Sequence, residues 1–166
     1  MRLETPRLLL RPVADDDAEA LLRLFRDPEV ARYLWDGEVV SREIVEAQIR
    51  TSRHRFERGG FGHFGVSTRD EPARLCGLVG LRPFGDPERM EIFYLLEPAS
   101  WGRGLATEAA QAVLRFGLDT LRFPEIFAGA DAPNTASFRV MERLGMVPAF
   151  ETGSGERRVV YYSCKR

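Results

Sequence analysis

The stretch WGRGLATEAA, residues 101–110, is the most informative part of this sequence for fold and for ligand binding, because two glycines stand there at the start of an amphipathic helix. The first amides of a helix have no intrahelical partner, and the helix dipole adds positive potential around them. Glycines allow an anionic group to approach these amides without meeting side chains, and phosphate is the usual ligand. We therefore expect the backbone of residues 103–107 to form a phosphate-binding turn, with Ala106 keeping the next position small.

Three readings of this turn compete. An ordinary P-loop is excluded because no lysine stands in the required place. A dinucleotide-binding turn fits poorly, since Thr107 occupies the position of the third small residue. An NAD-dependent oxidoreductase is therefore a weak alternative. The plainest alternative is a tight turn before an ordinary core helix, because residues such as Leu105, Ala109 and Val113 face a core on any interpretation.

Outward from this turn, the pattern predicts an α/β (α+β mixed) domain. Strands are expected at 5–13, in three middle segments between 61 and 97, at 124–130, and in a final pair after 146. Helices are expected after Asp15 or Asp16, from Ser41 to Gly59, from 105 to 120, and from Asn134 to Gly145. Short turns make the middle strands antiparallel. The helix between the strands at 89–96 and 124–130 makes that pair parallel.

Composition bounds the possible functions. The chain has 166 residues, 44% of them hydrophobic, and a formal net charge of −1, which fits a single domain over 1–166. This balance gives no reason to expect nucleic acid or a membrane as a partner. The only two cysteines, Cys76 and Cys164, are far apart in the sequence, so we expect free thiols and a cytoplasmic protein. No His and Cys spacing suggests a metal site.

Four segments, in this order, resemble one known family. Residues 101–106 resemble the Q/R-x-x-G-x-G/A pyrophosphate loop of the GNAT acetyltransferase superfamily, except that Trp101 replaces Gln or Arg. WGRGLATEA is similar to the form found in the ribosomal-protein-alanine N-acetyltransferase branch. LETPRLLLRP (3–12), MEIFYLLEP (90–98) and NTASFRVMERLGM (134–146) resemble the first strand, the central strand and a late helix of that branch.

The resemblance implies the GNAT fold, a central mixed, mostly antiparallel sheet of about seven strands flanked by about four helices. It implies acetyl-CoA as cosubstrate and an amine as acceptor. The strand 91–96 would splay from its neighbour and bind the pantetheine arm, Asn134 would bond that arm, and Ser137 would protonate the leaving thiolate. The implied cofactor-binding residues are Phe93, Leu95, Trp101, Gly102, Arg103, Gly104, Leu105, Ala106, Thr107, Asn134 and Ser137.

Two aromatic residues are expected at the acceptor. Phe93 replaces a glycine common in the branch, and its ring would narrow the cleft. Trp35 lies in a loop where the branch builds its acceptor wall, although a loop aromatic also packs on cores.

Glu91 is the candidate general base. Side chains alternate along a strand, so Glu91 shares a face with Phe93 and Leu95, and apolar surroundings favour a carboxylate that accepts a proton. A solvated glutamate at a strand end is the alternative. Similarly, Asn134 could act only as a helix N-cap, and Tyr94 is an alternative acid that points away from Glu91.

These observations favour an N-acetyltransferase that transfers acetyl directly to a primary amine, either a protein N-terminus or a small molecule. The alternative is a non-catalytic acyl-CoA-binding sensor on the same fold. That alternative gains if Glu91 points into solvent or if Phe93 blocks the cleft. Either a monomer or a homodimer is compatible with the sequence.

Overall fold

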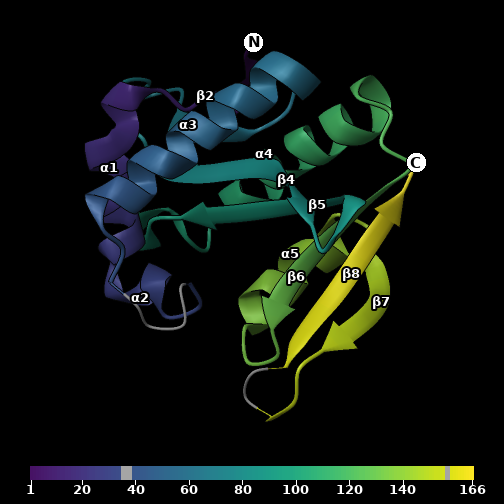
Figure 1. Ribbon diagram of the computed structural model, residues 1–166. Helices are drawn as coiled ribbons and strands as arrows, with labels where there is room; N and C mark the ends of the chain where they lie inside the picture. Colours follow the sequence, from purple (N-terminus) through teal and green to yellow (C-terminus); the bar gives the residue numbers. More distant parts are fainter. Residues whose placement is uncertain (35–38, 156–157) are drawn as a thin grey trace.

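The computed structural model describes residues 1–34, 39–155 and 158–166, and places them around one twisted sheet (Figure 1). Within these residues the sheet has eight strands in the order β1-β2-β3-β4-β5-β6-β8-β7. The strands are β1 Leu3–Glu4, β2 Leu8–Pro12, β3 His63–Thr68, β4 Gly77–Phe84, β5 Asp86–Leu96, β6 Glu125–Asp131, β7 Val147–Thr152 and β8 Val159–Lys165. The extra strand relative to the expected seven is the two-residue β1, which pairs with β2.

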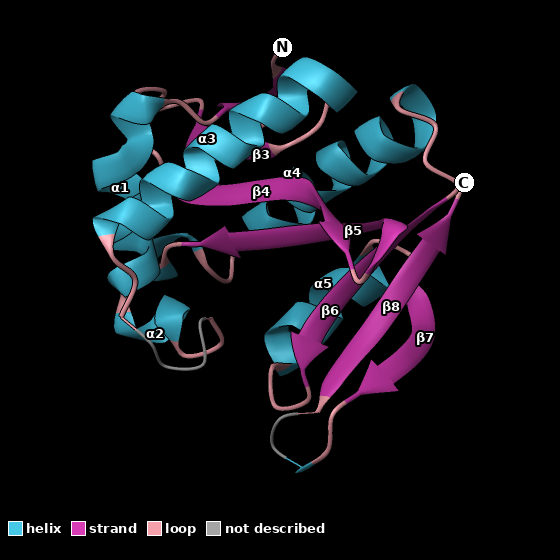
Figure 2. Ribbon diagram, in the orientation of Figure 1, coloured by secondary structure: helices cyan, strands magenta, loops and turns pink. Residues whose placement is uncertain are grey.

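The helices cover the two faces of the sheet (Figure 2). They are α1 Ala18–Arg26, α2 Pro28–Ala31, α3 Arg42–Gly59, α4 Leu105–Arg115 and α5 Thr135–Arg143. Helices α1 and α3 pack on one face, against Leu78, whereas α4 and α5 pack on the opposite face. The one-turn α2 is the addition to the four expected helices. The helix expected to reach residue 120 changes at Phe116 into a π-helical turn that ends at Thr120.

The helix ends show which of the predicted capping residues are correct. Ser41 caps α3 by accepting from the amide of Ile44, and Gly60 ends it with φ 72°. The expected cap at Asp15 or Asp16 is wrong, because both lie in a 3-10 turn that precedes α1. Asp17 is the residue before α1, and its carboxylate instead pairs with Arg11 at 2.7 Å.

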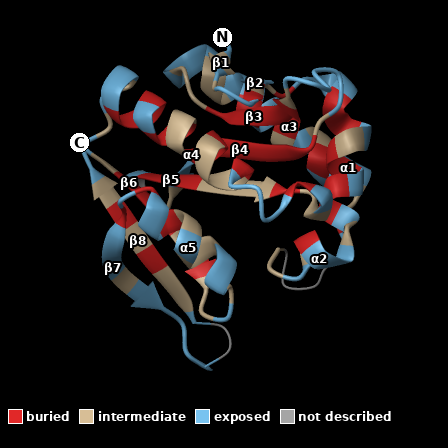
Figure 3. Ribbon diagram, turned by 180° about the vertical axis from the view of Figure 1, so that it is seen from behind, coloured by how far each residue is buried: buried red, intermediate tan, exposed pale blue. Residues whose placement is uncertain are grey.

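Most of the large apolar residues of β2, β3 and β4 are buried beneath these helices (Figure 3). The α4 face contributes Leu105, Ala109 and Val113 to the main core cluster. No helix among the described residues is long and apolar enough to cross a membrane.

The sheet opens between β5 and β6, and this opening positions the site. β5 pairs with β4 as far as Leu96, in the predicted antiparallel direction. With β6 it forms the predicted parallel pair, but only through Met90 opposite Ile126 and Glu91 opposite Phe127. Beyond Glu91 the two strands diverge, so the sheet separates into two halves that Figure 2 shows at an angle to each other.

Candidate active site

A cavity of about 670 Å³ occupies the opening between the two halves. It extends from α2, on the α1 side of the sheet, to the N-termini of α4 and α5 on the other side. Its walls come from α2 and the turn after it (Glu29, Val30, Tyr33, Leu34), from β4 and β5 (Arg82, Glu91, residues 92–96), from the glycine loop and α4 (Ser100, Trp101, Gly102, residues 104–107), and from β6, α5 and β8 (residues 129–131, Asn134, Ala136, Ser137, Arg139, Val140, Arg143, Val159, Tyr161).

The glycine loop, residues 101–104, has a backbone that only glycine adopts without strain. Gly102 has φ 71° and Gly104, the N-cap of α4, has φ 74°. The indole Nε1 of Trp101 donates to the carbonyl of Leu96 at 2.7 Å and so fastens the loop to the end of β5. Gly104 has no side chain with which to cap the first amides of α4, which leaves them available to an anion.

Two further observations fit a phosphate-bearing ligand at this end. The hydroxyl oxygen of Thr107, in the first turn of α4, is buried and has no hydrogen-bond partner among the residues that the structure describes. Buried hydroxyls normally have a partner, so this oxygen is suited to a ligand atom. Arg139 and Arg143, one turn apart on α5, bring two guanidinium groups to the same cavity. The residues present therefore fit coenzyme A at its pyrophosphate.

Glu91 lies at the centre of the cavity wall, at the last point where β5 pairs with β6. It is buried, with 5% of its surface exposed, and Nε of Arg82 donates to its carboxylate at 2.6 Å. The β4–β5 register places Arg82 directly opposite Glu91. The purely apolar setting expected for Glu91 is therefore wrong. The carboxylate combines burial with a cationic partner, Arg82, and it does not point into solvent.

The ring of Phe93 lies across β4 and not across the cavity. A side chain at Gly80, opposite Phe93, would come within 3.1 Å of this ring. Beyond Gly80 the ring meets His63 on β3, with ring centroids 4.6 Å apart, and the Arg82 guanidinium lies 5.3 Å from the Phe93 centroid. A Cβ at Gly80 would come still closer to the backbone of Gly62 and His63, at 2.5 and 2.9 Å, so glycine serves both this strand contact and the ring. Phe93 forms a wall of the cleft without closing it.

His63 is buried behind Phe93 and has an unusual electrostatic environment. Its Nε2 is buried and finds no hydrogen-bond partner within the described part of the chain. Burial, followed by the nearby charges of Arg55 and Arg82, lowers the pKa of His63 from 6.5 to about 3. The imidazole is therefore neutral at physiological pH, and His63 is not among the residues lining the cavity.

The first turn of α5 is tied to β5. Asn134 caps this helix by accepting from the amide of Ser137 at 3.2 Å, as its position in the sequence predicted. The hydroxyl of Tyr94 donates to the carbonyl of Ser137 at 3.0 Å. Burial raises the pKa of the Tyr94 hydroxyl despite this hydrogen bond, so it remains protonated. Both Asn134 and Ser137 line the cavity.

The structure brings nearly all the residues singled out from the sequence to this one cavity. Arg103 is the exception within the loop, because it does not line the cavity and its carbonyl is bonded to Arg7. Trp35 lies outside the described residues.

Sequence reasoning missed Tyr33, Arg82, Tyr161 and the arginine pair of α5. The i, i+4 spacing of Arg139 and Arg143 was a usable signal. The position of Tyr161 could not be predicted from local sequence signals. Tyr161 reaches the cavity because β8 pairs with β6, a strand that lies far away in the sequence.

Comparisons with known proteins agree with this geometry. A sequence model described as an acetyltransferase (GNAT) domain matches residues 7–147. The N-acetyltransferase YoaA of Bacillus subtilis is 32% identical over 144 residues, which cover 86% of this chain and 81% of that protein.

Two solved structures share the fold. A GNAT-family acetyltransferase from Bacillus anthracis has a TM-score of 0.81 at 27% identity, covering 99% of this chain and 98% of that one. The ribosomal L7/L12 α-N-protein acetyltransferase RimL, solved with coenzyme A, has a TM-score of 0.82 at 16% identity, with 99% and 98% covered. The second likeness concerns the fold alone.

Proposed function

The chain belongs to the GNAT acetyltransferase family, and we propose that it transfers the acetyl group of acetyl-CoA directly to a primary amine held beside Glu91. The observation that carries this proposal is the opening between β5 and β6. It joins the N-terminus of α4, which no side chain caps, on one side of the sheet to a buried carboxylate on the other. Two ligands that enter from opposite faces would meet there in the orientation that direct transfer needs.

Residues on the α4 side hold the cosubstrate in this proposal. The backbone of Gly102 and of residues 104–107 binds the pyrophosphate, and the Thr107 hydroxyl adds a hydrogen bond. Arg139 and Arg143 bind negative charge further along the ligand. The edge of β5 after Glu91, which β6 leaves unpaired, bonds the pantetheine arm beside Leu95 and Asn134. Acetyl-CoA supplies the activated acyl group and a thiolate leaving group.

Glu91 and Ser137 handle the protons. An amine is protonated near neutral pH, so it must lose a proton before it attacks. Glu91 accepts that proton, directly or through a water, while Arg82 holds the carboxylate in place. Ser137 also lines the cavity, and we propose that it gives a proton to the leaving thiolate. Phe93 and Tyr161 form the acceptor walls on the Glu91 side, together with Tyr33 and the predicted contribution of Trp35.

The lining of the site and the sequence resemblance both bear on the acceptor class that we propose. The cavity is bordered by α2 on one half of the sheet and by β8 on the other, and we propose that an extended chain lies between them. We favour a protein or peptide N-terminal amine over a small-molecule amine on this ground and on the sequence resemblance to ribosomal-protein acetyltransferases. The two free cysteines fit a reducing compartment, and we place the reaction in the cytoplasm.

Release of the CoA thiol from acetyl-CoA tests this proposal. Purified protein is mixed with acetyl-CoA and a panel of N-terminal peptides, amino acids, polyamines and aminoglycosides, and thiol release is followed for each. We expect at least one amine to give acetylated product, identified by mass, with a bias toward peptides. CoA binding without transfer to any amine would contradict the proposal and favour the acyl-CoA-binding module.

A further inference from the structure

We propose that Arg7 and Glu108 form a clamp that holds the glycine loop in its ligand-binding conformation before CoA arrives. This inference rests on the proposed function, because it assigns Arg7 and Glu108 as positioning residues for CoA at that loop. It joins two sequence segments, TPR (residues 5–7) and ATE (residues 106–108). The clamp residues Arg7 and Glu108 are not among the residues that line the main cavity, whereas Ala106 and Thr107 are.

Glu108 is saturated by donors from the N-terminal segment. Its Oε1 accepts from the Thr5 hydroxyl at 2.6 Å and from the Arg7 amide at 2.9 Å. Its Oε2 accepts from Nε of Arg7 at 2.6 Å and pairs with the terminal guanidinium nitrogen at the same distance. The Glu108 side chain is only 17% exposed. These donors lower the pKa of Glu108 although partial burial alone would raise it, so the carboxylate is charged.

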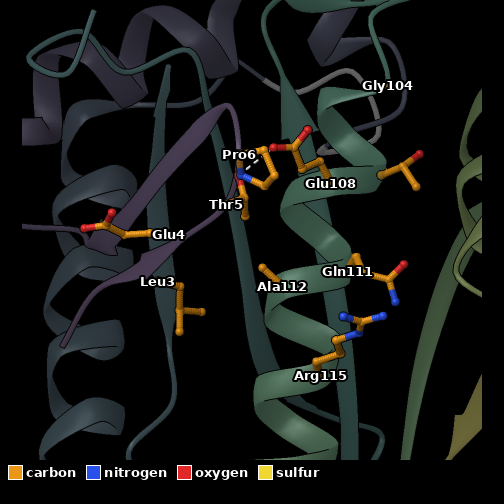
Figure 4. A pocket seen from close by; sticks show the side chains of 10 residues that line it. Leu3, Glu4, Thr5, Pro6, Gly104, Glu108, Gln111, Ala112 and Arg115 are labelled. Carbon is orange, nitrogen blue, oxygen red and sulfur yellow. Dashed lines mark hydrogen bonds between the residues drawn. The ribbon is translucent and has the colours of Figure 1, made fainter. Parts of the chain in front are cut away.

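The clamp lies beside a surface groove along α4. The groove, about 620 Å³, runs between the N-terminal segment and α4, and Gly104 and Thr107 line both this groove and the main cavity. Figure 4 shows Glu108 directed from α4 toward Thr5 and Pro6, with Gly104 one turn above it. The loop thus has the CoA cavity on one side and the clamp on the other.

Arg7 extends the clamp into the loop itself. Its second terminal nitrogen donates to the carbonyl of Arg103 at 2.8 Å, between the two glycines of positive φ. In a trans peptide the C=O and the following N–H point in opposite directions. Holding the Arg103 carbonyl toward Arg7 therefore turns the amide of Gly104 away from the clamp. Because Gly104 also lines the main cavity, that amide is set for an anion there.

The physical benefit is preorganisation. Glycines lose more backbone freedom on ordering than other residues, and a loop ordered only on binding weakens affinity by that cost. With the clamp, the loop loses this backbone freedom when the protein folds and not when the ligand binds. It also neutralises Glu108, whose bare carboxylate in the first turn of α4 would repel a pyrophosphate at the same helix terminus.

The test compares Arg7→Gln with a matched ion pair that does not touch the loop carbonyl. Arg74 pairs with Glu97 at 2.6 Å with side-chain exposures of 54% and 21%, close to the 50% and 17% of Arg7 and Glu108. Isothermal titration with CoA and steady-state kinetics with acetyl-CoA are measured for wild type, Arg7→Gln, Arg7→Lys and Arg74→Gln. Glu108→Gln replaces Arg7→Gln if the latter does not fold.

We expect Arg7→Gln to raise the Kd for CoA and the KM for acetyl-CoA about tenfold, while kcat at saturation stays within twofold. Arg7→Lys can pair with Glu108 but lacks the fork that reaches the Arg103 carbonyl at the same time. It should therefore recover thermal stability without recovering CoA affinity. Arg74→Gln should bind CoA like wild type.

Wild-type CoA affinity in folded Arg7→Gln, or an equal loss in Arg74→Gln, would overturn the clamp and leave the proposed function standing. Failure of the wild-type protein to bind CoA would instead overturn the proposed function, and the clamp with it.

Discussion

Nε of Arg82 lies 2.6 Å from Oε2 of Glu91, at the last residue through which β5 pairs with β6. The pair therefore marks the point where the sheet opens. A carboxylate here is held by the hairpin on one side and faces the cavity on the other. The position of the candidate base is therefore fixed by two paired strands, and no helix or loop is needed to hold it.

Glu91→Gln should lower kcat by about 10²-fold or more, since general-base catalysis contributes on that order. The amide is nearly isosteric and cannot accept the proton. CoA binding should be retained, because the glycine loop is on the other side of the sheet. Glu151→Gln, which alters an exposed carboxylate paired with Arg158 on the outer strand, is the control and should keep wild-type kcat. Turnover within threefold of wild type in Glu91→Gln would exclude Glu91 as the base.

Phe93→Leu should enlarge the acceptor side of the cavity and shift selectivity toward bulkier amines. The smaller side chain leaves the space over Gly80 partly empty and relaxes the wall beside Glu91. The measurement is the ratio of kcat/KM for a large and a small amine. Phe123→Leu is the matched control, because Phe123 is a partly buried aromatic that packs edge-on against Phe61 and does not line the cavity. An unchanged ratio in Phe93→Leu would remove Phe93 from the acceptor site.

Ser137→Ala and Tyr94→Phe separate the two candidate acids. If Ser137 protonates the thiolate, Ser137→Ala lowers kcat by about 10²-fold. Tyr94→Phe removes one hydrogen bond to the Ser137 carbonyl and should cost about 1 kcal/mol of unfolding free energy, with a small effect on kcat. Urea denaturation and kcat are measured for both. A kcat loss confined to Tyr94→Phe would reverse the assignment.

His63 should make the protein less stable in acid. Its pKa is about 3 in the folded protein and about 6.5 when unfolded, so only the unfolded state binds this proton between those values. The unfolding free energy contributed by His63 is fully present above pH 6.5 and falls by up to about 1.4 kcal/mol per pH unit as the pH drops toward 3.

His63→Phe keeps an aromatic ring against Phe93 and should flatten the stability profile between pH 6.5 and 4, as measured by urea denaturation. His54→Phe removes the other histidine, which is exposed on α3, and should leave the profile unchanged. An identical slope in wild type and His63→Phe would show that His63 does not carry the acid sensitivity.

Local signals in the sequence were sufficient for most of the fold. The N-caps Ser41 and Asn134 and the stop at Gly60 follow from short-range backbone chemistry, and the alternation of β5 separates Glu91 from Ile92 correctly. One failure was also local. Asp15 and Asp16 are good cap residues by type, but Asp17 is the one that the Arg11 side chain reaches.

The environment of Glu91 could not be predicted, because it depends on strand register. A bulge between Pro83 and Phe84 shifts the β4–β5 hairpin, so counting back from its turn does not place Arg82 opposite Glu91. Likewise, the orientation of Phe93 depends on Gly80, a neighbour on another strand. The glycine loop was accessible from sequence, since glycine adopts the positive φ found at Gly102 and Gly104 without strain, and a glycine pair before a helix is a local signal.

The most direct test of the account is thermal stabilisation by CoA, acetyl-CoA and NAD in wild type, Gly104→Trp and Gly145→Trp. Gly104 and Gly145 have matching φ angles of 74° and 76°, and Gly145 lies in the open at the end of α5, so both changes carry similar backbone strain. Ligands that bind the native state raise its apparent stability. The account predicts stabilisation by both CoA ligands in wild type and Gly145→Trp, its loss in Gly104→Trp, and none with NAD. No stabilisation of wild type by saturating CoA or acetyl-CoA, or an unchanged response in Gly104→Trp, would contradict it.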